Sequence, residues 1–477
     1  MNDTGTKGYY QGGGINSYLS PLLADGVLIH SVNMVSNYVG SKEKRTGYTP
    51  FLGTADGSQV QSLHAFPNIN NDPTKTNLIR ASGSALYYST QGTGAWTTMT
   101  NGTINAGSHF GAAILLNTMV GGDGVGSSRY TTDGTSWTQA AGAPVAEHWA
   151  QYQGRIYGAG TSTYLTASSS DEPTNWGQTS PDDGFTMLIP DEGRLGKPFV
   201  VSNRLIIPKS TGEMYKWDTY NLIDMSTKYG PSSPYSIGKI EDYAFFVNQY
   251  GNYGFSGALP QLISNGIQRQ FYNGANTGIA GTQFTKAPGV CHIYDYYVSV
   301  GTITDDFTSR TIPNCIIKYD YKKNEYLNYS FATQPTAWYS YTDTTGIKQL
   351  IWGDATGQCY KMDNTVTTDN GNPINSELVY VFHYGVPELK KKWNWWRGFF
   401  NPGCEAKVQV ACSNVYSYQN LKWTDLGETT NGFVEYRFQQ SENTTPVSRF
   451  LFVRIYDASN SKCVFLGQNV AAEVQLV

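Results

Sequence analysis

A hairpin that ends in tryptophan recurs in the first half of the chain, and it constrains the fold more than any other feature. Its copies are YYSTQGTGAWTT (Tyr87–Thr98), RYTTDGTSWTQ (Arg129–Gln139) and LTASSSDEPTNWGQ (Leu165–Gln178). Gly-Thr-Gly and Asp-Gly supply turns, and the returning strand carries the ring of Trp96, Trp137 or Trp176. These tryptophans follow one another at about 40 residues, the length of one four-stranded blade of a β-propeller. We expect each ring to fill the gap between two neighbouring blades.

Later segments keep the strand–turn–strand shape without the tryptophan. They are Gly193–Asp218, Pro234–Ser264, Tyr296–Tyr326 and Gln349–Asp363. Short apolar runs bounded by Gly, Asn, Asp, Ser or Pro are typical of all-β proteins, and no stretch keeps helical apolar spacing for three turns. The sequence therefore predicts an all-β protein with a β-propeller of about six or seven blades over residues 48–369.

The two flanks of this region have a different pattern. Residues 1–47 are a Gly-rich arm followed by a first strand, which we expect to lie apart from the propeller. Residues 370–477 hold strand-like runs that are too few and too differently spaced for further blades. A C-terminal β-sandwich of about 100 residues fits an ordinary domain size. We therefore predict three parts: arm, propeller and sandwich.

Charge and cysteine content narrow the classes of function. The 477 residues carry a formal net charge of −4 and 15% charged side chains, so global charge does not favour binding to nucleic acid. All six cysteines lie in the second half without a CxxC pair, and even the nearest two, Cys404 and Cys412, flank a strand-like run. We expect no zinc site and mostly free thiols. The N-terminus lacks the features of a signal peptide and no apolar run is long enough to span a membrane, which predicts synthesis in the cytoplasm.

No group of residues has a recognisable catalytic pattern. The sequence contains no P-loop, GxGxxG or GxSxG motif, and the run Gly121–Ser127 is not followed by a helix that could hold a phosphate. Adjacent acids such as Asp182 and Asp183 are expected in solvated turns. The histidines share no metal-ligand spacing, so we expect turn or packing roles for His30, His64, His109, His148, His292 and His383. We predict no catalytic residue, no cofactor-binding residue and no metal ligand.

The segment KKKWNWWRGFF (Lys390–Phe400) is the most unusual in the chain. Because Trp and Arg are frequent anchors of protein interfaces, it is a candidate partner interface. The residues concerned are Lys390, Lys391, Lys392, Trp393, Trp395, Trp396 and Arg397. Two other interpretations stay open: a sandwich strand with inward rings and a basic edge, and a nucleic-acid contact in which bases stack on rings beside cations. The low charge of the whole chain disfavours the nucleic-acid contact.

Several segments resemble the β-propeller tail proteins of tailed bacteriophages, namely the tail-hub, packaged-DNA-stabilisation and nozzle proteins. The similar runs are Ser31–Gly53, Ala167–Trp176, VSNRLIIPKSTGEMYKWD (Val201–Asp218), Tyr229–Ser264 and the C-terminal SRFLFVRIYDASNSKCVFLGQNVAAEVQLV. The resemblance implies a structural protein of the virion, in a homo-oligomeric ring of the tail or neck and in contact with other tail or portal proteins. DNA would pass through the channel of that ring without sequence-specific binding. No catalytic residue or cofactor is implied.

Two other functions remain open at this point. Exposed Tyr and Trp rings could stack on sugars, which would suit a propeller that binds a glycan or a receptor. The hairpin Arg129–Gln139 resembles the Asp-box of sialidase-like propellers, where an Asp caps the turn and a Trp packs between strands, a structural role. A sialidase-like hydrolase would also need a tyrosine nucleophile and a set of clamping arginines, and no such set stands out.

Overall fold

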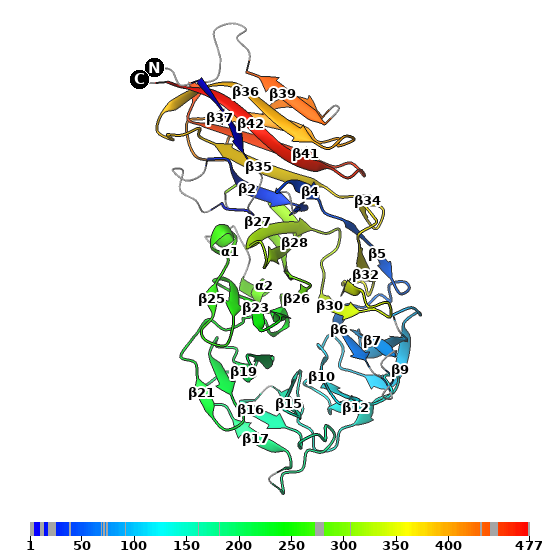
Figure 1. Ribbon diagram of the computed structural model, residues 1–477. Coiled ribbons are helices and arrows are strands. Elements are labelled where there is room, and N and C mark those ends of the chain that lie inside the picture. The colour runs from blue at the N-terminus through cyan, green and yellow to red at the C-terminus, as the bar shows by residue number, and fades with distance from the viewer. Residues whose placement is uncertain are drawn as a thin grey trace.

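In the computed structural model of the protein the regular secondary structure is almost entirely β-strand, which confirms the all-β prediction (Figure 1). The structure describes residues 4–9, 14–17, 25–37, 40–67, 69, 72, 75–90, 92–160, 162–180, 182–271, 281–305, 307–429, 432–438 and 447–475. Helices in these residues are single turns: α1 (Gln268–Phe271), α2 (Gly281–Phe284) and the 3₁₀ turns η2 (Pro234–Ser236) and η3 (Asn265–Ile267). Within the described residues, no helix has the length and apolarity that crossing a membrane would require.

Five separate sheets of four antiparallel strands follow one another along the chain, each built from consecutive strands joined by turns. The first sheet has β6 (Val60–Pro67), β7 (Thr76–Ser82), β8 (Ala85–Thr90) and β9 (Thr97–Thr103), and the second has β10 (Gly111–Leu115), β11 (Thr118–Gly122), β12 (Arg129–Thr131) and β13 (Thr138–Gln139). The third has β14 (His148–Tyr152), β15 (Arg155–Ala159), β16 (Tyr164–Ala167) and β17 (Phe185–Leu188), and the fourth has β18 (Phe199–Val201), β19 (Arg204–Pro208), β20 (Met214–Trp217) and β21 (Leu222–Asp224). The fifth has β22 (Gly238–Ile240), β23 (Tyr243–Asn248), β24 (Gly251–Phe255) and β25 (Gln261–Leu262). Sequential meanders of this kind are the units of propeller architectures.

Two further four-stranded units complete a propeller-like circle, here called the strand ring (Figure 1). One consists of β26 (Gly289–His292), β27 (Asp295–Thr304), β28 (Thr311–Asp320) and β29 (Glu325–Ser330), and the other of β30 (Ala337–Thr342), β31 (Lys348–Gly353), β32 (Cys359–Asp363) and β5 (Gly47–Phe51). The first strand of one four-stranded unit contacts the first strand of the next. These contacts run from β30 through β6, β10 and β14 to β18, and from β22 through β26 to β30. Since β5 precedes the first sheet but pairs with β32 of the last, opening the strand ring requires breaking this ladder.

Apolar side chains fill the space between consecutive sheets of the strand ring. Trp137 is 1% exposed and lies in a cluster that takes residues from β6–β9 and from β10–β11. Trp176 packs edge-to-face on Trp149 at 6.0 Å, in a cluster that also includes residues of β10 and β11. Trp96 is half-buried against a cluster shared by β6–β7 and β30–β32, with the Arg80 guanidinium 5.0 Å from its ring. Each of the three repeat tryptophans therefore contacts two neighbouring sheets.

The turn before Trp137 shows how a polar hairpin holds its shape. Asp133 Oδ1 accepts hydrogen bonds from the backbone N–H groups of Thr135 at 2.7 Å and Ser136 at 2.9 Å. Gly134 takes a φ of +68°, which glycine adopts without strain. Partial burial raises the pKa of Asp133, but these hydrogen bonds outweigh it and lower the pKa to about 2. The carboxylate is thus part of the turn.

A second unit, here called the C-terminal unit, packs two sheets face to face above the strand ring (Figure 1). One sheet has the order β3 (Met34–Ser36), β4 (Lys42–Lys44), β42 (Val464–Gln475), β36 (Lys390–Phe400) and β39 (Phe433–Arg437), with β1 (Thr4–Tyr9) on β42 and β40 (Val447–Ser448) on β36. The other has β2 (Val27–Val32), β35 (Ser376–Phe382), β41 (Phe450–Asp457), β37 (Lys407–Ser413) and β38 (Thr424–Glu428). Tyr380 and Val453 of the second sheet share one core with Trp396 and Phe465 of the first.

Strand β36 contains the whole of the candidate interface segment. Trp393 and Trp396 are fully buried in the core of the C-terminal unit, and Lys391 is also 0% exposed. Alternate strand residues face opposite sides, so two rings three positions apart would normally diverge. A register shift between Trp393 and Trp395 inserts Asn394 as a bulge and brings Trp393 and Trp396 to the same face. These two rings and Lys391 are therefore core residues, and the interface prediction is left with Lys390, Lys392, Trp395 and Arg397.

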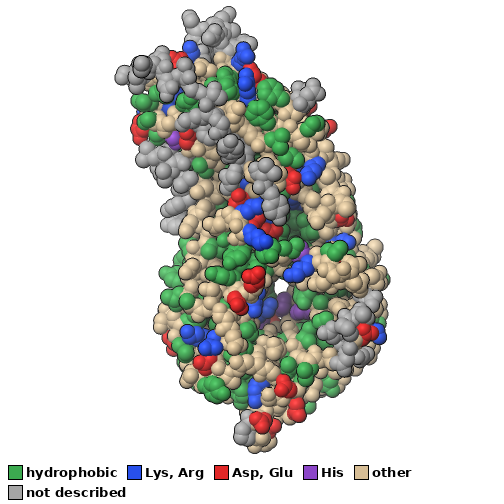
Figure 2. All heavy atoms as spheres, in the orientation of Figure 1, with side chains coloured by type: hydrophobic (Ala, Val, Ile, Leu, Met, Phe, Trp, Pro, Cys, Tyr) green, Lys and Arg blue, Asp and Glu red, His purple; other side chains and the backbone are tan. Residues whose placement is uncertain are grey.

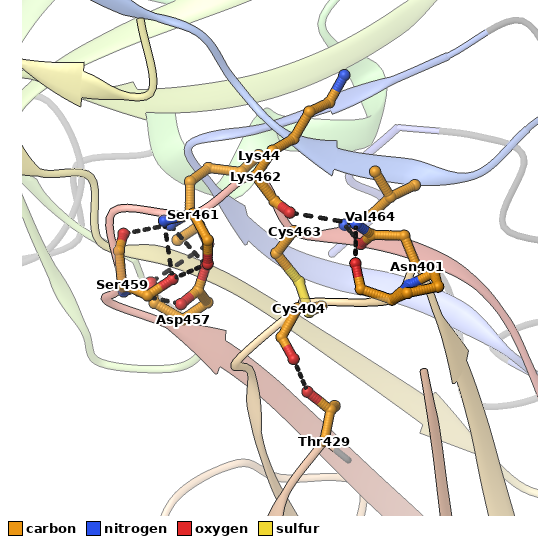
Figure 3. The surroundings of a disulfide bond; sticks show 12 residues. Lys44, Asn401, Cys404, Thr429, Asp457, Ser459, Ser461, Lys462, Cys463 and Val464 are labelled. Carbon is orange, nitrogen blue, oxygen red and sulfur yellow. Dashed lines mark hydrogen bonds and ion pairs between the residues drawn. A yellow bond between two sulfur atoms is a disulfide. The ribbon is translucent and has the colours of Figure 1, made fainter. Parts of the chain in front are cut away.

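A disulfide links Cys404, in the connection after β36, to Cys463, just before β42 (Figure 3). The same two connections are joined by hydrogen bonds, since Asn401 N–H donates to the Val464 carbonyl at 2.9 Å and Asn401 Oδ1 accepts from Val464 N–H at 2.6 Å. Four cysteines are free: Cys291, Cys315, Cys359 and Cys412. The disulfide does not join the pair nearest in sequence, because β36 and β42 are neighbours in the sheet.

The strand ring and the C-terminal unit are joined through a continuous sheet. The outer strand β29 pairs with β2 through Val32 and Asn328, so the four strands β26–β29 continue into β2, β35, β41, β37 and β38. The short strands β33 (Thr368–Asp369) and β34 (Asn372–Pro373) lie beside β5 at this junction. A buried ion pair of 2.5 Å joins Arg45 to Asp369. Of the predicted N-terminal arm, the strands β1, β2, β3 and β4 thus belong to the C-terminal unit, while residues 1–3, 10–13, 18–24 and 38–39 lie outside the described residues.

Candidate functional site

A cavity of about 580 Å³ lies at the centre of the strand ring. Its walls come from the first strands β6, β10, β14, β26 and β30 and from the segments that lead into β18 and β22. Figure 2 shows Lys or Arg and His side chains gathered in the hollow of this face. The first strands approach one another closely here, and a Cβ on Gly111 would lie 1.9 Å from the Glu147 carbonyl oxygen. Glycine at this position therefore permits the contact between β10 and the start of β14.

Three histidines come from three consecutive sheets and reach the same cavity. His64 lies on β6, His109 precedes β10, and His148 begins β14. The Nε2 atom of His64 lies 2.8 Å from the Phe110 carbonyl oxygen. A carbonyl can only accept a hydrogen bond, so His64 carries its proton on Nε2. The sequence-based expectation of packing roles missed this convergence.

A tyrosine and a glutamate stand beside two of these histidines. The Tyr235 ring lies 4.3 Å from the His109 ring and 5.8 Å from the His148 ring, measured between centroids. The Tyr235 hydroxyl donates a hydrogen bond to Glu147 Oε1, and His109 Nδ1 lies 3.9 Å from the same oxygen. Tyr235 therefore connects the acid to the imidazoles.

Desolvation favours the neutral form of the three imidazoles. Desolvation lowers the pKa of His64 to about 4 and that of His148 to about 3, and it lowers the pKa of His109 as well. The Lys197 charge adds to the lowering at all three rings. Burial raises the pKa of Glu147 and, together with the Glu147 charge, raises the pKa of Tyr235 far above its usual range. A tyrosine whose hydroxyl is held neutral in this way is a poor nucleophile.

Cations dominate the rest of the polar lining. Lys197, Arg194 and Lys286 all line the cavity. Asp123 also lines it, but its carboxylate accepts hydrogen bonds from the Asn105 side chain at 2.9 Å and from the Gly126 backbone N–H at 2.8 Å. Among the described residues, no group of three His, Cys, Asp or Glu side chains is placed to hold a metal ion. The arrangement suits binding of a negatively charged group better than of a cation.

The geometry also bears on the sialidase-like alternative. The cavity holds one tyrosine–glutamate pair, but Arg194 is the single arginine among the described residues that line it. A set of clamping arginines of the sialidase type is thus not assembled by these residues, and the raised pKa of Tyr235 argues against a nucleophilic role. No reaction can be assigned to the cavity on this basis.

A periodic signal in the sequence could have located the site. His64, His109 and His148 follow one another at about 40 residues, which is the blade spacing already visible in the tryptophans. In a propeller-like ring, residues that recur at the blade period occupy equivalent positions in consecutive sheets. The histidines thus lie around the axis, whereas Trp96, Trp137 and Trp176 lie between the sheets, and the residues of β36 lie in the C-terminal unit.

Comparisons with known proteins add little to this picture. No family model matches the chain, and no curated protein matches it. Among solved structures, the computationally designed Ika8 protein is 12% identical over 74% of this chain and 99% of its own, with a TM-score of 0.40. BBS1N in complex with ARL6DN is 9% identical over 67% and 97%, with a TM-score of 0.41, and YCF48 from Cyanidioschyzon merolae is 10% identical over 66% and 98%, with a TM-score of 0.41. All three TM-scores are below 0.5.

Proposed function

We propose that this protein is a structural component of the virion of a tailed bacteriophage, which assembles with copies of itself into a ring in the tail or neck. What carries the proposal is the resemblance of Val201–Asp218 and Tyr229–Ser264 to phage tail propellers. In this proposal the seven four-stranded units are the blades of a seven-bladed propeller, and the C-terminal unit is a β-sandwich.

The junction between the two units supports a role as a rigid building block. A sheet that runs without interruption from β26 to β38 fixes the orientation of the strand ring relative to the C-terminal unit. Buried ion pairs at this junction, Arg45 with Asp369 and Lys42 with Glu325, add directional contacts. A subunit that keeps its shape presents the same faces to each neighbour, which closed symmetric assemblies require.

The outward face of β36 is the surface proposed for contact between copies. Trp395 is partly exposed there, with the Arg397 guanidinium 4.4 Å from its ring. Arg397 also forms an ion pair of 2.6 Å with Glu435 on the neighbouring strand β39. A ring beside a guanidinium on a flat strand surface is the kind of anchor that protein interfaces use.

The size and shape of the purified protein in solution test this proposal. We expect light scattering coupled to size-exclusion chromatography to give a multiple of the monomer mass, and negative-stain images to show closed rings. Trp395→Asp is expected to shift the protein to monomer. Tyr220→Asp serves as the control and is expected to leave the assembly intact, because Tyr220 lies on the strand ring and is 87% exposed. Mass spectrometry of purified phage particles then tests the place of the protein. A chain that stays monomeric and is absent from particles contradicts the proposal.

One observation favours glycan binding as a second candidate function. Tyr229 and Tyr250 are each 50% exposed, their ring centroids lie 5.9 Å apart, and Tyr229 stacks on Tyr253 at 5.8 Å. Exposed aromatic faces of this kind can pack against the apolar faces of sugar rings. A glycan array with the protein and with Tyr229→Ala tests it: hits that the variant loses support the candidate, and an array without hits removes it.

A further inference from the structure

Lys197 lines the central cavity without a partner of opposite charge. No hydrogen bond or ion pair is formed by its ammonium group with any described residue. Burial alone lowers the pKa of Lys197, with no carboxylate to oppose it. Lys197 is half-buried, and an ammonium group that is partly withdrawn from water without a counter-ion is favoured by the arrival of an anion.

Other groups around Lys197 are also left with hydrogen-bonding capacity. The Ser62 hydroxyl lines the cavity from β6 and is buried without a hydrogen-bond partner among the described residues. His109 Nδ1 likewise lacks a hydrogen bond, since its nearest acid oxygen, on Glu147, is 3.9 Å away. A hydroxyl and a neutral imidazole can both donate to an oxygen atom. Buried polar groups that stay unsatisfied call for an explanation, and a bound ligand is one.

The charges that line the cavity favour a ligand of negative charge. The acids are engaged: Glu147 accepts from the Tyr235 hydroxyl, and Asp123 accepts from the backbone N–H groups of its own turn. Lys197 and Lys286 have no ion pair among the described residues, and Arg194 contributes a third positive charge. Lys197 would repel a metal ion, whereas it would attract an oxyanion.

We propose that the cavity at the centre of the strand ring binds a small molecule through an oxyanion group, such as a phosphoryl, sulfate or carboxylate group, with Lys197 as the counter-ion. After a rotation of their side chains, Ser62 and His109 can donate hydrogen bonds to the same group, because their polar atoms lie just behind the cavity surface. The inference does not depend on the proposed role in the virion, because the cavity is formed by the strand ring of a single chain.

The size of the cavity favours an anion that is part of a larger molecule. Its volume of about 580 Å³ is that of a site for a small organic ligand and far exceeds a single tetrahedral ion. Tyr339 of β30 and Tyr235, which both line it, are only half-buried. A flat or ring-shaped body attached to the oxyanion could pack against these side chains.

Isothermal titration of the full chain at pH 7 and constant ionic strength tests the site. The probes are inorganic phosphate, glucose 6-phosphate and, as the uncharged control, glucose. We expect saturable binding of at least one phosphate probe and none of glucose. Lys197→Met should weaken that binding at least tenfold, because it removes the charge at nearly constant side-chain length. Lys216→Met, on β20 of the four-stranded sheet that Lys197 precedes but outside the cavity, is the matched control and should change the affinity less than twofold.

Two further measurements keep the test decisive. Lys197→Arg retains the cation and should bind within a few-fold of the wild type, which separates loss of charge from loss of folding. The titration of the histidine rings by NMR, with and without sulfate, supplies a second readout, because a bound anion favours the protonated imidazole and should raise the apparent pKa values of His109 and His148. The proposal is overturned if neither phosphate probe binds saturably, or if Lys197→Met and Lys216→Met weaken binding equally.

Discussion

The strand ring and the C-terminal unit are both built from strands, but they connect their strands in opposite ways. In the strand ring nearly every strand pairs with the next one along the chain, and only β5 is brought from a distance to close the circle. In the C-terminal unit the central ladder joins β36 to β42, and strands from the N-terminal side, β1 and β4, pair with the same β42. Local pairing requires little loop closure, whereas distant pairing requires much more before its contacts form.

The two regions also differ in what holds their interiors together. The strand ring places apolar clusters between sheets and leaves histidines and lysines around its axis. The C-terminal unit has one core between two sheets, with two fully buried tryptophans and a disulfide at the end of the strands that carry them. The repeated region thus places polar groups in a shared central cavity, while the non-repeated region has a large apolar core between its sheets and a second apolar cluster on the other face of β35, β37 and β41.

The largest expected loss of stability comes from a substitution in the core of the C-terminal unit. Trp393 is fully buried, and its Nε1 donates a hydrogen bond of 2.8 Å to Ser448 Oγ. Trp393→Ala should lower the free energy of unfolding by about 3–5 kcal/mol, because it leaves a large cavity and removes the hydrogen bond to Ser448 Oγ, which keeps its own bond to the Phe450 carbonyl. Urea unfolding measures the loss. Trp395→Ala, on the same strand but the opposite face, is the control and should cost less than about 1 kcal/mol.

Hydrogen exchange read by mass spectrometry shows where that loss falls. If the two regions differ as described, Trp393→Ala should speed exchange in β36 and β42 and leave β10–β17 unchanged. Equal acceleration in both regions would contradict the view that the C-terminal unit depends on its own core.

Removal of the disulfide in the C-terminal unit is a second test of how the two regions differ. Cys404 and Cys463 are separated by 59 residues, so the link restricts a long loop of the unfolded chain. Replacing both with alanine should lower the free energy of unfolding by about 2–4 kcal/mol. Cys412→Ala, at a free cysteine in the same unit, should have a smaller effect. Non-reducing peptide mapping checks the link itself, and free thiols at both positions in protein folded under oxidising conditions would refute it.

Much of the strand ring was predictable from the sequence, because its contacts are local. The spacing of Trp96, Trp137 and Trp176 predicted the repeating unit, and these rings lie between consecutive sheets. The closing strand β5 was not predicted, since nothing in Gly47–Phe51 shows which distant strand it pairs with. Pairing partners of edge strands depend on the finished tertiary structure and leave no local pattern.

The C-terminal unit was less predictable, and the reasons are physical. The bulge at Asn394 changes which face Trp396 occupies, and a single inserted residue has no signature in composition or spacing. The partner of Cys404 could not be found by proximity in sequence, because sheet order brings Cys463 beside it instead of Cys412. The histidine site of the strand ring was missed for another reason: metal-ligand spacing was sought within one segment, while His64, His109 and His148 recur once per sheet.

Per unit of pH, the smallest expected effect concerns the axis of the strand ring and its response to acid. His148 faces His109, Tyr235 and Lys197, and burial lowers its pKa to about 3. In the unfolded chain a histidine titrates near its ordinary value of about 6.5, so below that pH the unfolded state takes up a proton that the folded state does not. The stabilising contribution of neutral His148 is thus complete above about pH 6.5 and declines as the pH falls towards about 3, by up to about 1.4 kcal/mol per pH unit.

His148→Gln should therefore flatten the fall of stability between pH 6.5 and pH 4 without changing its direction, since His64 and His109 also have lowered pKa values. Urea unfolding at a series of pH values measures the slope, and the difference between the two proteins at pH 8, where neither state takes up the proton, gives the cost of the substitution itself. Hydrogen exchange at pH 5 should show β6, β10 and β14 opening before the C-terminal unit. Parallel slopes in wild type and variant would mean that His148 is not held neutral, and the acid sensitivity of the strand ring would then come from His64 and His109 alone.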